Sequence, residues 1–296
     1  MVVVGSANVD YLISVDRRPV PGETVMARGL RTLGGGKGAN QAFAAALAGA
    51  EVHFVACVGD DALGEQRMAE LASVGVRTAL VRRAAGSLTG LAFITVTPDG
   101  ENDIIVAPGA NAALGREDVD AAAHLLAGPC VLLAQLEVPH PATARAIELA
   151  GPQARVVLNL SPWRRLPAEL LGRVDVLVVN EVEAAAMWGS PVGTVAEAME
   201  AGRALRGAGP SAVVVTLGAA GAVAVADGLE EHVPSPPVEV VDTTGAGDAF
   251  AGALAARRAL GYDLLEAVRY GAAMGSATTS RLGAQAVAPG TSSLSC

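Results

Sequence analysis

Short apolar runs alternate with amphipathic segments along most of this chain of 296 residues. The runs are rich in β-branched residues or leucine, which is typical of buried strands. The segments between them place apolar residues at helical spacing. This alternation predicts an α/β fold, with a mostly parallel central sheet flanked by helices. The expected strands are residues 1–4, 52–58, 131–136, 156–160, 176–179 and 212–217, and the expected helices are residues 64–74, 116–126, 142–149 and 196–205.

Two stretches break the alternation. Residues 10–33 have no helical pattern and are interrupted by Pro19 and Pro21. Residues 90–106 predict a β-hairpin, because two apolar runs flank a turn at Pro98-Asp99-Gly100. We expect these lid segments, about 10–33 and 89–107, to form a small β-sheet inserted in a single domain over residues 1–296. Such a sheet could cover a site or form a dimer surface.

Composition argues against several classes of partner. Hydrophobic residues make up 51% of the chain and charged residues 17%, which is enough to build a large core. Aromatic residues, at 3%, are too few for the stacking surfaces that bind single-stranded nucleic acid. A formal net charge of −9 without a basic block also makes nucleic acid and anionic membranes poor partners.

The sequence does not predict an export signal or a cysteine-based metal site. Cys57, Cys130 and Cys296 are widely spaced and form no CxxC pair, so neither a disulfide framework nor a zinc site is expected. The apolar start at residues 1–4 lacks a basic flank, and no window approaches the length of a membrane span. We therefore expect a cytoplasmic protein that does not bind membranes.

The segment from Asp242 to Asp248 carries the strongest functional signal. Gly245 and Gly247 allow a tight turn and a close approach to a ligand, and a helix is expected over residues 246–260. The start of a helix exposes amide groups and a positive dipole end, which favour an anion. Asp248, in the first turn, is either an acid that complements the dipole or a general base beside developing negative charge.

A glycine-rich segment, Gly34 to Gln41, precedes another expected helix at residues 42–47. It lacks the Ser or Thr that a Walker loop places after its lysine, and it lacks the third glycine of a dinucleotide fingerprint. Its glycines would bring the backbone close to a ligand, while Lys37 and Asn40 would offer donors to hydroxyl groups. The alternative is a flexible turn ahead of a helix.

Polar residues follow several of the expected strands. Ligands of open α/β sheets bind beyond the carboxyl ends of the strands, so these residues are candidates for ligand contacts. Asn8 and Asp10 lie two residues apart after the first strand and suit a pair of vicinal hydroxyls. Glu137 follows the strand at residues 131–136. The alternative for Asn8 and Asp10 is that they are ordinary turn residues that close a strand.

Later strand ends carry features that suit metal and phosphate. Asn180 and Glu183 share one face of an expected helix start. Oxygen donors of this kind suit Mg²⁺ held together with water and substrate phosphates, although a capping box explains the same spacing. The segment from Thr216 through Gly218 to Gly221 could hold a nucleotide phosphate or form only a hairpin turn.

Two motifs give the chain a resemblance to a known family. The strings Gly-Gly-Lys-Gly-Ala-Asn-Gln at residues 35–41 and Asp-Thr-Thr-Gly-Ala-Gly-Asp at residues 242–248 resemble the two signature regions of the ribokinase-like carbohydrate kinases. The resemblance runs from Val4 to about Pro289. The first string favours the ribokinase branch over fructokinase-like and adenosine kinase-like members.

The resemblance implies roles for individual residues. Asp248 resembles the catalytic base, and Gly245, Ala246 and Gly247 resemble the anion hole. The residues that resemble sugar contacts are Asn8, Asp10, Gly36, Lys37, Asn40, Glu137 and Asp248. Those that resemble the magnesium and nucleotide regions are Asn180 and Glu183, with the metal bound through water, and Thr216, Gly218, Gly221 and Gly247. Those that align with a monovalent-cation loop, which uses mainly backbone oxygens, are Asp242, Thr244, Thr278, Arg281 and Gly283.

The resemblance also implies an activity. It indicates a phosphotransferase that uses ATP with Mg²⁺ to phosphorylate the 5-hydroxyl of D-ribose, giving D-ribose 5-phosphate. A monovalent cation, expected to be K⁺, would order the anion hole, and the lid would form a homodimer. The alternatives are a kinase of another furanose or of a nucleoside, or a non-catalytic sugar or nucleotide sensor that keeps the fold.

Overall fold

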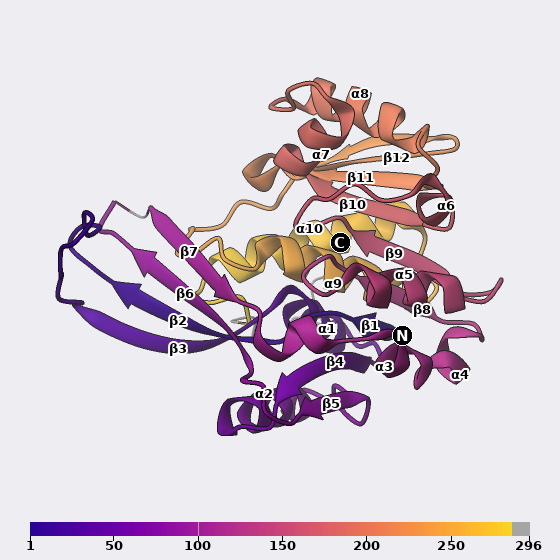
Figure 1. Cartoon of the computed structure of the whole chain (residues 1–296). Coiled ribbons are helices and arrows are strands. Elements are labelled where there is room, and N and C mark those ends of the chain that lie inside the picture. The colour runs from indigo at the N-terminus through magenta and orange to yellow at the C-terminus, as the bar shows by residue number, and fades with distance from the viewer. Residues whose placement is uncertain (100, 286–296) are drawn as a thin grey trace.

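A computed structural model describes residues 1–99 and 101–285 of the protein. Its main feature is a nine-stranded sheet in which the seven strands from β11 to β5 are parallel to one another, while β12 and β13 are antiparallel additions at one edge (Figure 1). The strands in spatial order are β13 (Leu229–Val233), β12 (Ala222–Ala226), β11 (Ala212–Thr216), β10 (Val176–Asn180), β9 (Arg155–Asn159), β8 (Val131–Ala134), β1 (Val2–Val4), β4 (His53–Gly59) and β5 (Val81–Ala84).

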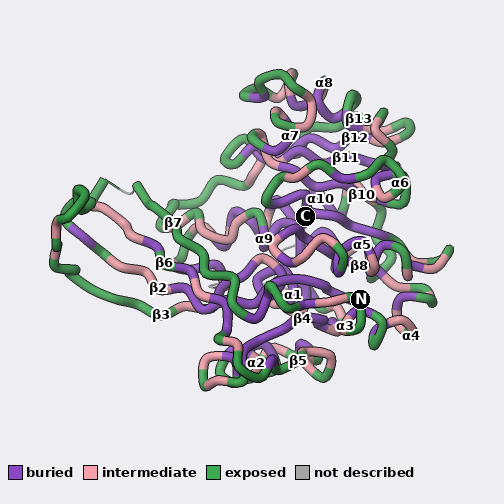
Figure 2. Tube along the Cα trace, in the orientation of Figure 1, coloured by how far each residue is buried: buried purple, intermediate pink, exposed green. Residues whose placement is uncertain are grey.

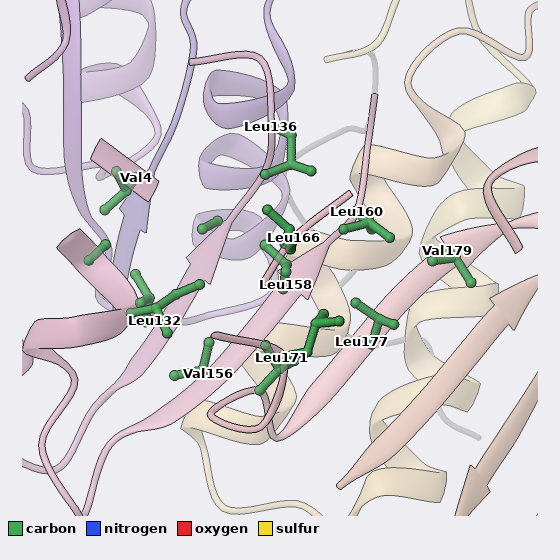
Figure 3. Packing of buried hydrophobic residues seen from close by; sticks show 14 of the residues in the cluster. Val4, Leu132, Leu136, Val156, Leu158, Leu160, Leu166, Leu171, Leu177 and Val179 are labelled. Carbon is green, nitrogen blue, oxygen red and sulfur yellow. The ribbon is translucent and has the colours of Figure 1, made fainter. Parts of the chain in front are cut away.

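Helices cover both faces of this sheet, because its central strands are apolar on both sides. Alternate residues of one strand belong to different cores: Val2 and Val4 face one layer of helices, and Val3 faces the other. Figure 3 shows the first core, to which Leu132 and Leu158 both contribute. The helices on that face are α3 (Arg116–Asp120), α4 (Ala123–Leu126), α5 (His140–Leu149), α6 (Ala168–Leu171), α7 (Glu181–Trp188) and α8 (Val195–Arg206), and those on the other face are α1 (Lys37–Leu47), α2 (Ala62–Ser73), α9 (Ala246–Ala259) and α10 (Leu264–Thr279).

The second sheet is small and extends to one side of the main body, as Figure 1 shows. Its order is β3-β2-β6-β7, and it is built from the two expected lid segments. The outer pairs are antiparallel and the central pair, β2 with β6, is parallel. Figure 2 shows that β7 is exposed along its length. The bounds are β2 (Asn8–Ser14), β3 (Gly29–Gly35), β6 (Gly90–Val96) and β7 (Asn102–Ala107).

Three details differ from the sequence-based expectation. The helix expected over residues 116–126 is divided into α3 and α4, because the Ala122 amide turns back to the Val119 carbonyl. The helix after the glycine-rich segment begins at Lys37, five residues before its apolar part, since Gly36 adopts φ 86° and caps it. Short 3₁₀ turns occupy Gly109–Ala113 and Gly218–Ala220. In the part of the chain that the structure describes, no helix is both long and apolar enough to cross a membrane.

Candidate active site

A cavity of about 200 Å³ opens where the carboxyl ends of β9, β10 and β11 meet the first turn of α9. Parallel strands end at one edge of their sheet, so polar residues far apart in the sequence converge there. Seven of the expected site residues lie in its wall. The lining residues are Lys37, Asn159, Ser161, Val178, Asn180, Glu183, Thr216, Gly245, Gly247 and Asp248.

Asp248 is the central group of this site. Its side chain is only 6% exposed, in the first turn of α9, where the helix dipole favours an anion. Two amides from α1 hold its carboxylate: Asn40 Nδ2 donates to Oδ2 at 3.0 Å, and Gln41 Nε2 donates to Oδ1 at 3.0 Å. The carboxylate is therefore fixed in both position and rotation while it faces the cavity.

Lys37 adds a positive charge to the same cavity. The pKa of its ammonium is raised, chiefly by Asp248 and further by Glu137 and Glu183. Burial acts in the opposite direction and lowers this pKa. Lys37 therefore stays charged beside the wall formed by α7 and α9. Lys37 was predicted as a sugar contact, and it lines the same cavity as Asp248.

Asn8 and Asp10 lie on one face of β2, as their spacing predicts. The Asn8 Oδ1 accepts a hydrogen bond of 2.7 Å from Asn111, whose own Oδ1 accepts from the Ala7 amide. Asp10 lies against Gly35, where any side chain would overlap its carboxylate. Its Oδ1 is buried without a hydrogen-bond partner among the described residues.

The environment of Asp10 changes its acidity. Burial raises its pKa from 3.8 to about 6, and Glu137 and Asp248 add to that rise. Arg67 is the opposing influence. Asp10 is therefore ionised at neutral pH, and its Oδ1 is shielded from water without a donor among the described residues, which leaves this oxygen free to accept a hydrogen bond from a ligand.

Glu137 follows β8 and bonds to the loop that precedes α1. Its Oε2 accepts from Ser6 Oγ at 2.6 Å and from the Lys37 amide at 2.9 Å. These bonds tie the end of β1 to the glycine-rich segment. Gly36 has φ 86°, and a side chain there would approach the Asn8 amide to 2.7 Å. The glycine is required by this close passage of two backbones.

The first turn of α9 presents amide groups toward the cavity. Gly245 is the N-cap, with φ 76°, and a side chain there would overlap Ala284. Nothing lies within 4 Å of the position that a Gly247 side chain would take. The Ala246 amide already bonds to the Thr243 carbonyl at 3.3 Å. The helix itself provides no acceptor for the amides of Gly247 and Asp248.

Asn180 and Glu183 form the capping box that was the alternative to a metal-related role. Asn180 Oδ1 accepts from the Glu183 amide at 2.8 Å, and Glu183 Oε2 accepts from the Asn180 amide at 3.0 Å. Both residues also line the cavity, so the two interpretations are compatible. The described residues contain no cluster of three His, Cys, Asp or Glu side chains that could hold a metal ion by themselves.

The segment after β11 separates into two parts. Thr216 lines the cavity. Gly218 begins a 3₁₀ turn, and Gly221, with φ 93°, leads into β12, where a side chain would overlap the Val233 carbonyl. The Leu217 amide bonds to the Gly221 carbonyl at 2.8 Å. Gly218 and Gly221 therefore form a hairpin turn.

The two segments expected to hold a monovalent cation lie side by side. Asp242 accepts from the Thr244 amide at 2.9 Å and from the Gly283 amide at 2.8 Å, so its carboxylate joins them. The Asp242 amide bonds to the Thr279 carbonyl. The Thr278 carbonyl accepts from the Arg281 amide at 3.3 Å. Ala284, directly after the second segment, packs against Gly245.

Several polar residues of this site were not identified from the sequence, among them Gln41, which holds the Asp248 carboxylate. Asn111 and Gln135 are fully or almost fully buried and bond to site residues far away in the chain. Asn159 and Ser161 line the cavity after β9. Asn159 and Ser161 could have been found from their place at the end of a strand, as Asn180 and Thr216 were.

Comparison with known proteins agrees with this geometry. The family model described as pfkB family carbohydrate kinase matches residues 1–290. The chain is 35% identical over 290 residues to a ribokinase of Haemophilus influenzae, with 98% of this chain and 95% of that protein covered. It is 37% identical over 255 residues to a deoxyribokinase of Salmonella typhi, with 86% and 83% covered.

A solved structure shows the same fold. The ribokinase of Arabidopsis thaliana, complexed with ribose and ATP, superposes with a TM-score of 0.85 at 32% sequence identity. The match covers 96% of this chain and 93% of that one. The chain belongs to the pfkB family of carbohydrate kinases, phosphotransferases that act on a sugar hydroxyl.

Proposed function

We propose that the protein transfers the γ-phosphate of ATP to the 5-hydroxyl of D-ribose, giving D-ribose 5-phosphate and ADP. One observation carries the proposal. The Asp248 carboxylate is buried, held by two amides, and placed at the start of α9 in the wall of a cavity that also contains Lys37 and Glu183. The ribokinase relatives and the ribose complex of the Arabidopsis protein support the choice of sugar.

The sugar would bind on the lid side of Asp248. Asn8, Asp10 and Glu137 supply oxygen acceptors there, together with donors from Asn40. The unpartnered Oδ1 of Asp10 suits a sugar hydroxyl that donates to it, because the bond would remove the penalty of an unsatisfied buried anion. Binding of this kind orients the 5-hydroxyl toward Asp248.

Asp248 would act as the general base. It accepts the proton of the 5-hydroxyl while that oxygen attacks the γ-phosphorus, and the bond from phosphorus to the β–γ bridging oxygen breaks. The amides at the start of α9 and the Lys37 ammonium would stabilise the charge on the transferring group. A group such as Asp248 contributes about 10²–10⁴-fold to the rate, and positioning contributes most of the rest.

The residues present fit a magnesium ion bound mainly by phosphates and water. Glu183 and Asn180 stand in the cavity wall, and Glu183 Oε2 is held by the Asn180 amide. Mg²⁺ would neutralise charge on the ATP phosphates. We infer that Glu183 orients water molecules of that ion and that Thr216 contacts the nucleotide.

A monovalent cation would bind between the segments at Asp242–Thr244 and Thr278–Gly283. The carboxylate of Asp242 is occupied by two amide donors, so backbone carbonyls are the available ligands. A large, weakly hydrated ion such as K⁺ suits such oxygens. The ion would act by ordering the Gly245 turn.

We further propose a cytoplasmic homodimer that joins through the lid. The outer strand β7 exposes Ile104, Ile105 and Val106, which are 55%, 71% and 50% accessible. A second lid placed on this strand would cover them and would protect the open sheet edge. Light scattering of wild type and of the variant Ile105→Glu tests this, and a monomeric wild type would contradict it.

The proposed activity is tested by ADP formation with a panel of acceptors. The panel contains D-ribose, 2-deoxy-D-ribose, D-fructose and adenosine, each with wild type and with Asp248→Asn. Turnover that is highest with ribose and nearly lost in the variant supports the proposal. Preference for 2-deoxyribose or adenosine would replace the sugar, and binding without turnover would favour a sensor of the same fold.

A further inference from the structure

A chain of buried amides leads away from Asp248. Gln41 Nε2 donates to Asp248 Oδ1 at 3.0 Å and to Asn159 Oδ1 at 2.9 Å, so both of its protons are used. On its other side, Gln41 Oε1 accepts a bond of 2.6 Å from Gln135 Nε2. Asn159 Nδ2 in turn donates to the Val178 carbonyl at 3.2 Å.

The orientation of each amide in this series follows from the last acceptor, the Val178 carbonyl. A backbone carbonyl can only accept, so the NH₂ group of Asn159 must face Val178 and its oxygen must face Gln41. Gln41 must then present its NH₂ group to Asn159. The Gln41 NH₂ group also donates to Asp248, its second acceptor, and the Gln41 oxygen is left to face Gln135.

We propose that Gln135 is a positioning residue for the catalytic base: by donating to the Gln41 oxygen, it keeps the Gln41 NH₂ group directed at Asp248. Gln41 and Gln135 are both fully buried, so water does not replace a missing donor. Gln135 is itself held in place, because its amide packs against Gly5, where any side chain would overlap it.

Gln135 gives up a hydrogen bond of its own in this position. Its Oε1 is buried and has no hydrogen-bond partner among the described residues. An unsatisfied buried amide oxygen is costly, and an apolar side chain of similar size would avoid the cost. A requirement for the donor explains why an amide stands there.

The second carboxylate oxygen of Asp248 is held in a similar manner. Asn40 Nδ2 donates to Oδ2, and Asn40 Oδ1 accepts from Gln285 Nε2 at 2.9 Å. Each amide that touches the base is thus fixed from behind by another glutamine. In the described part of the chain, the charged side chains near the base include Lys37, Asp10 and Glu183, and none of the three takes part in these bonds.

The variant Gln135→Glu tests the role of the donor, with ribose and MgATP saturating. Burial favours the neutral form of the new carboxyl, which can donate to Gln41 and support turnover. Once pH rises through the pKa of that carboxyl, it can only accept, and it opposes the Gln41 oxygen. We expect kcat to fall there on the order of tenfold to a hundredfold relative to wild type.

Two further variants separate positioning from folding. Gln135→Met has similar size but no donor, so its kcat should be reduced by one constant factor at every pH. Gln153→Glu adds a carboxyl at an exposed turn and should behave as wild type. Thermal melts at each pH show whether every variant is folded.

The role of Gln135 rests on the proposed role of Asp248, but different experimental results would contradict the two roles. If wild type does not phosphorylate ribose, or if Asp248→Asn remains active, the proposed function is wrong. If both behave as expected but Gln135→Glu keeps the wild-type pH profile, or Gln135→Met keeps the wild-type kcat, Gln135 does not position the base.

Discussion

Replacing Asp10 with asparagine should stabilise the substrate-free protein while it weakens sugar binding. The Asp10 carboxylate is 9% exposed, and its Oδ1 has no hydrogen-bond partner among the described residues. Burial raises its pKa from 3.8 to about 6, so ionisation of this group destabilises the folded state. Asp10→Asn keeps the shape of the side chain and removes the charge.

The size of the effect follows from the pKa. One pKa unit corresponds to about 1.4 kcal/mol, so the difference between 3.8 and about 6 lowers the free energy of unfolding by about 3 kcal/mol. Because the folded pKa is the higher one, this cost is absent below pH 3.8. It grows as pH rises toward 6 and is complete above it. The stabilisation by Asp10→Asn should therefore be largest near pH 8 and small near pH 4.

The assay is urea unfolding of wild type and Asp10→Asn between pH 4 and pH 8, without sugar. Asp60→Asn, which removes an exposed carboxylate in the loop before α2, is the matched control. Ribose should stabilise wild type more than Asp10→Asn at pH 8, because the variant keeps only one uncharged acceptor oxygen and carries an NH₂ donor in place of the other. A difference in unfolding free energy that does not change with pH would refute the assigned cost of ionised Asp10.

Three other changes test the rest of the site. Asp248→Asn should lower kcat by about 10²–10⁴-fold with the fold and ribose binding retained, and stopped assays with calorimetric ribose titration check this. Gly35→Ala would push the Asp10 carboxylate aside, so the KM for ribose should rise roughly tenfold or more while the KM for ATP stays constant; Gly128→Ala, with open space around it, is the control. Ribose-dependent ADP formation should be faster in K⁺ than in Na⁺ or tetramethylammonium at matched ionic strength, and equal rates in all three would argue against a cation between Asp242 and Gly283.

The main sheet and the place of the site were predictable because both depend on local pattern. Runs such as Val131–Ala134 are apolar on both faces, which predicts buried parallel strands. Residues that follow such strands converge at one edge, which groups Glu183 with Thr216. Asp248 was identified instead from the glycines and the helix start around it, because the described residues between β13 and α9 form no strand. The edge strands β12 and β13 were not predicted, and β13 is mostly exposed, so it lacks the apolar run of a central strand.

The supporting residues depend on strand order, which no local pattern encodes. Asn111 bonds to Ala7 and Asn8 from more than 100 residues away, and Gln135 bonds to Gln41 across 94 residues. The Gln135 contact exists because β8 lies beside β1, over whose end α1 packs, and the Asn111 contact exists because the 3₁₀ turn at Gly109–Ala113 packs against β4 and β6. In sequence, a glutamine at the end of an apolar run is indistinguishable from one that faces solvent.

The position of Arg67, a buried charged residue, could not be predicted from the sequence either. It lies in α2 and is 1% exposed, with an ion pair to Glu70 and its guanidinium against Gly34. Successive residues of a strand point to opposite faces of the sheet. Arg67 occupies the space where a side chain at Gly34 would lie, and Asp10 occupies the corresponding space at Gly35, so the two charged groups lie on opposite faces of β3. Only residues without side chains let the two charges approach so closely. The two glycines therefore leave room for Arg67 on one face of β3 and for Asp10 on the other, and the positive charge of Arg67 opposes the rise in the Asp10 pKa.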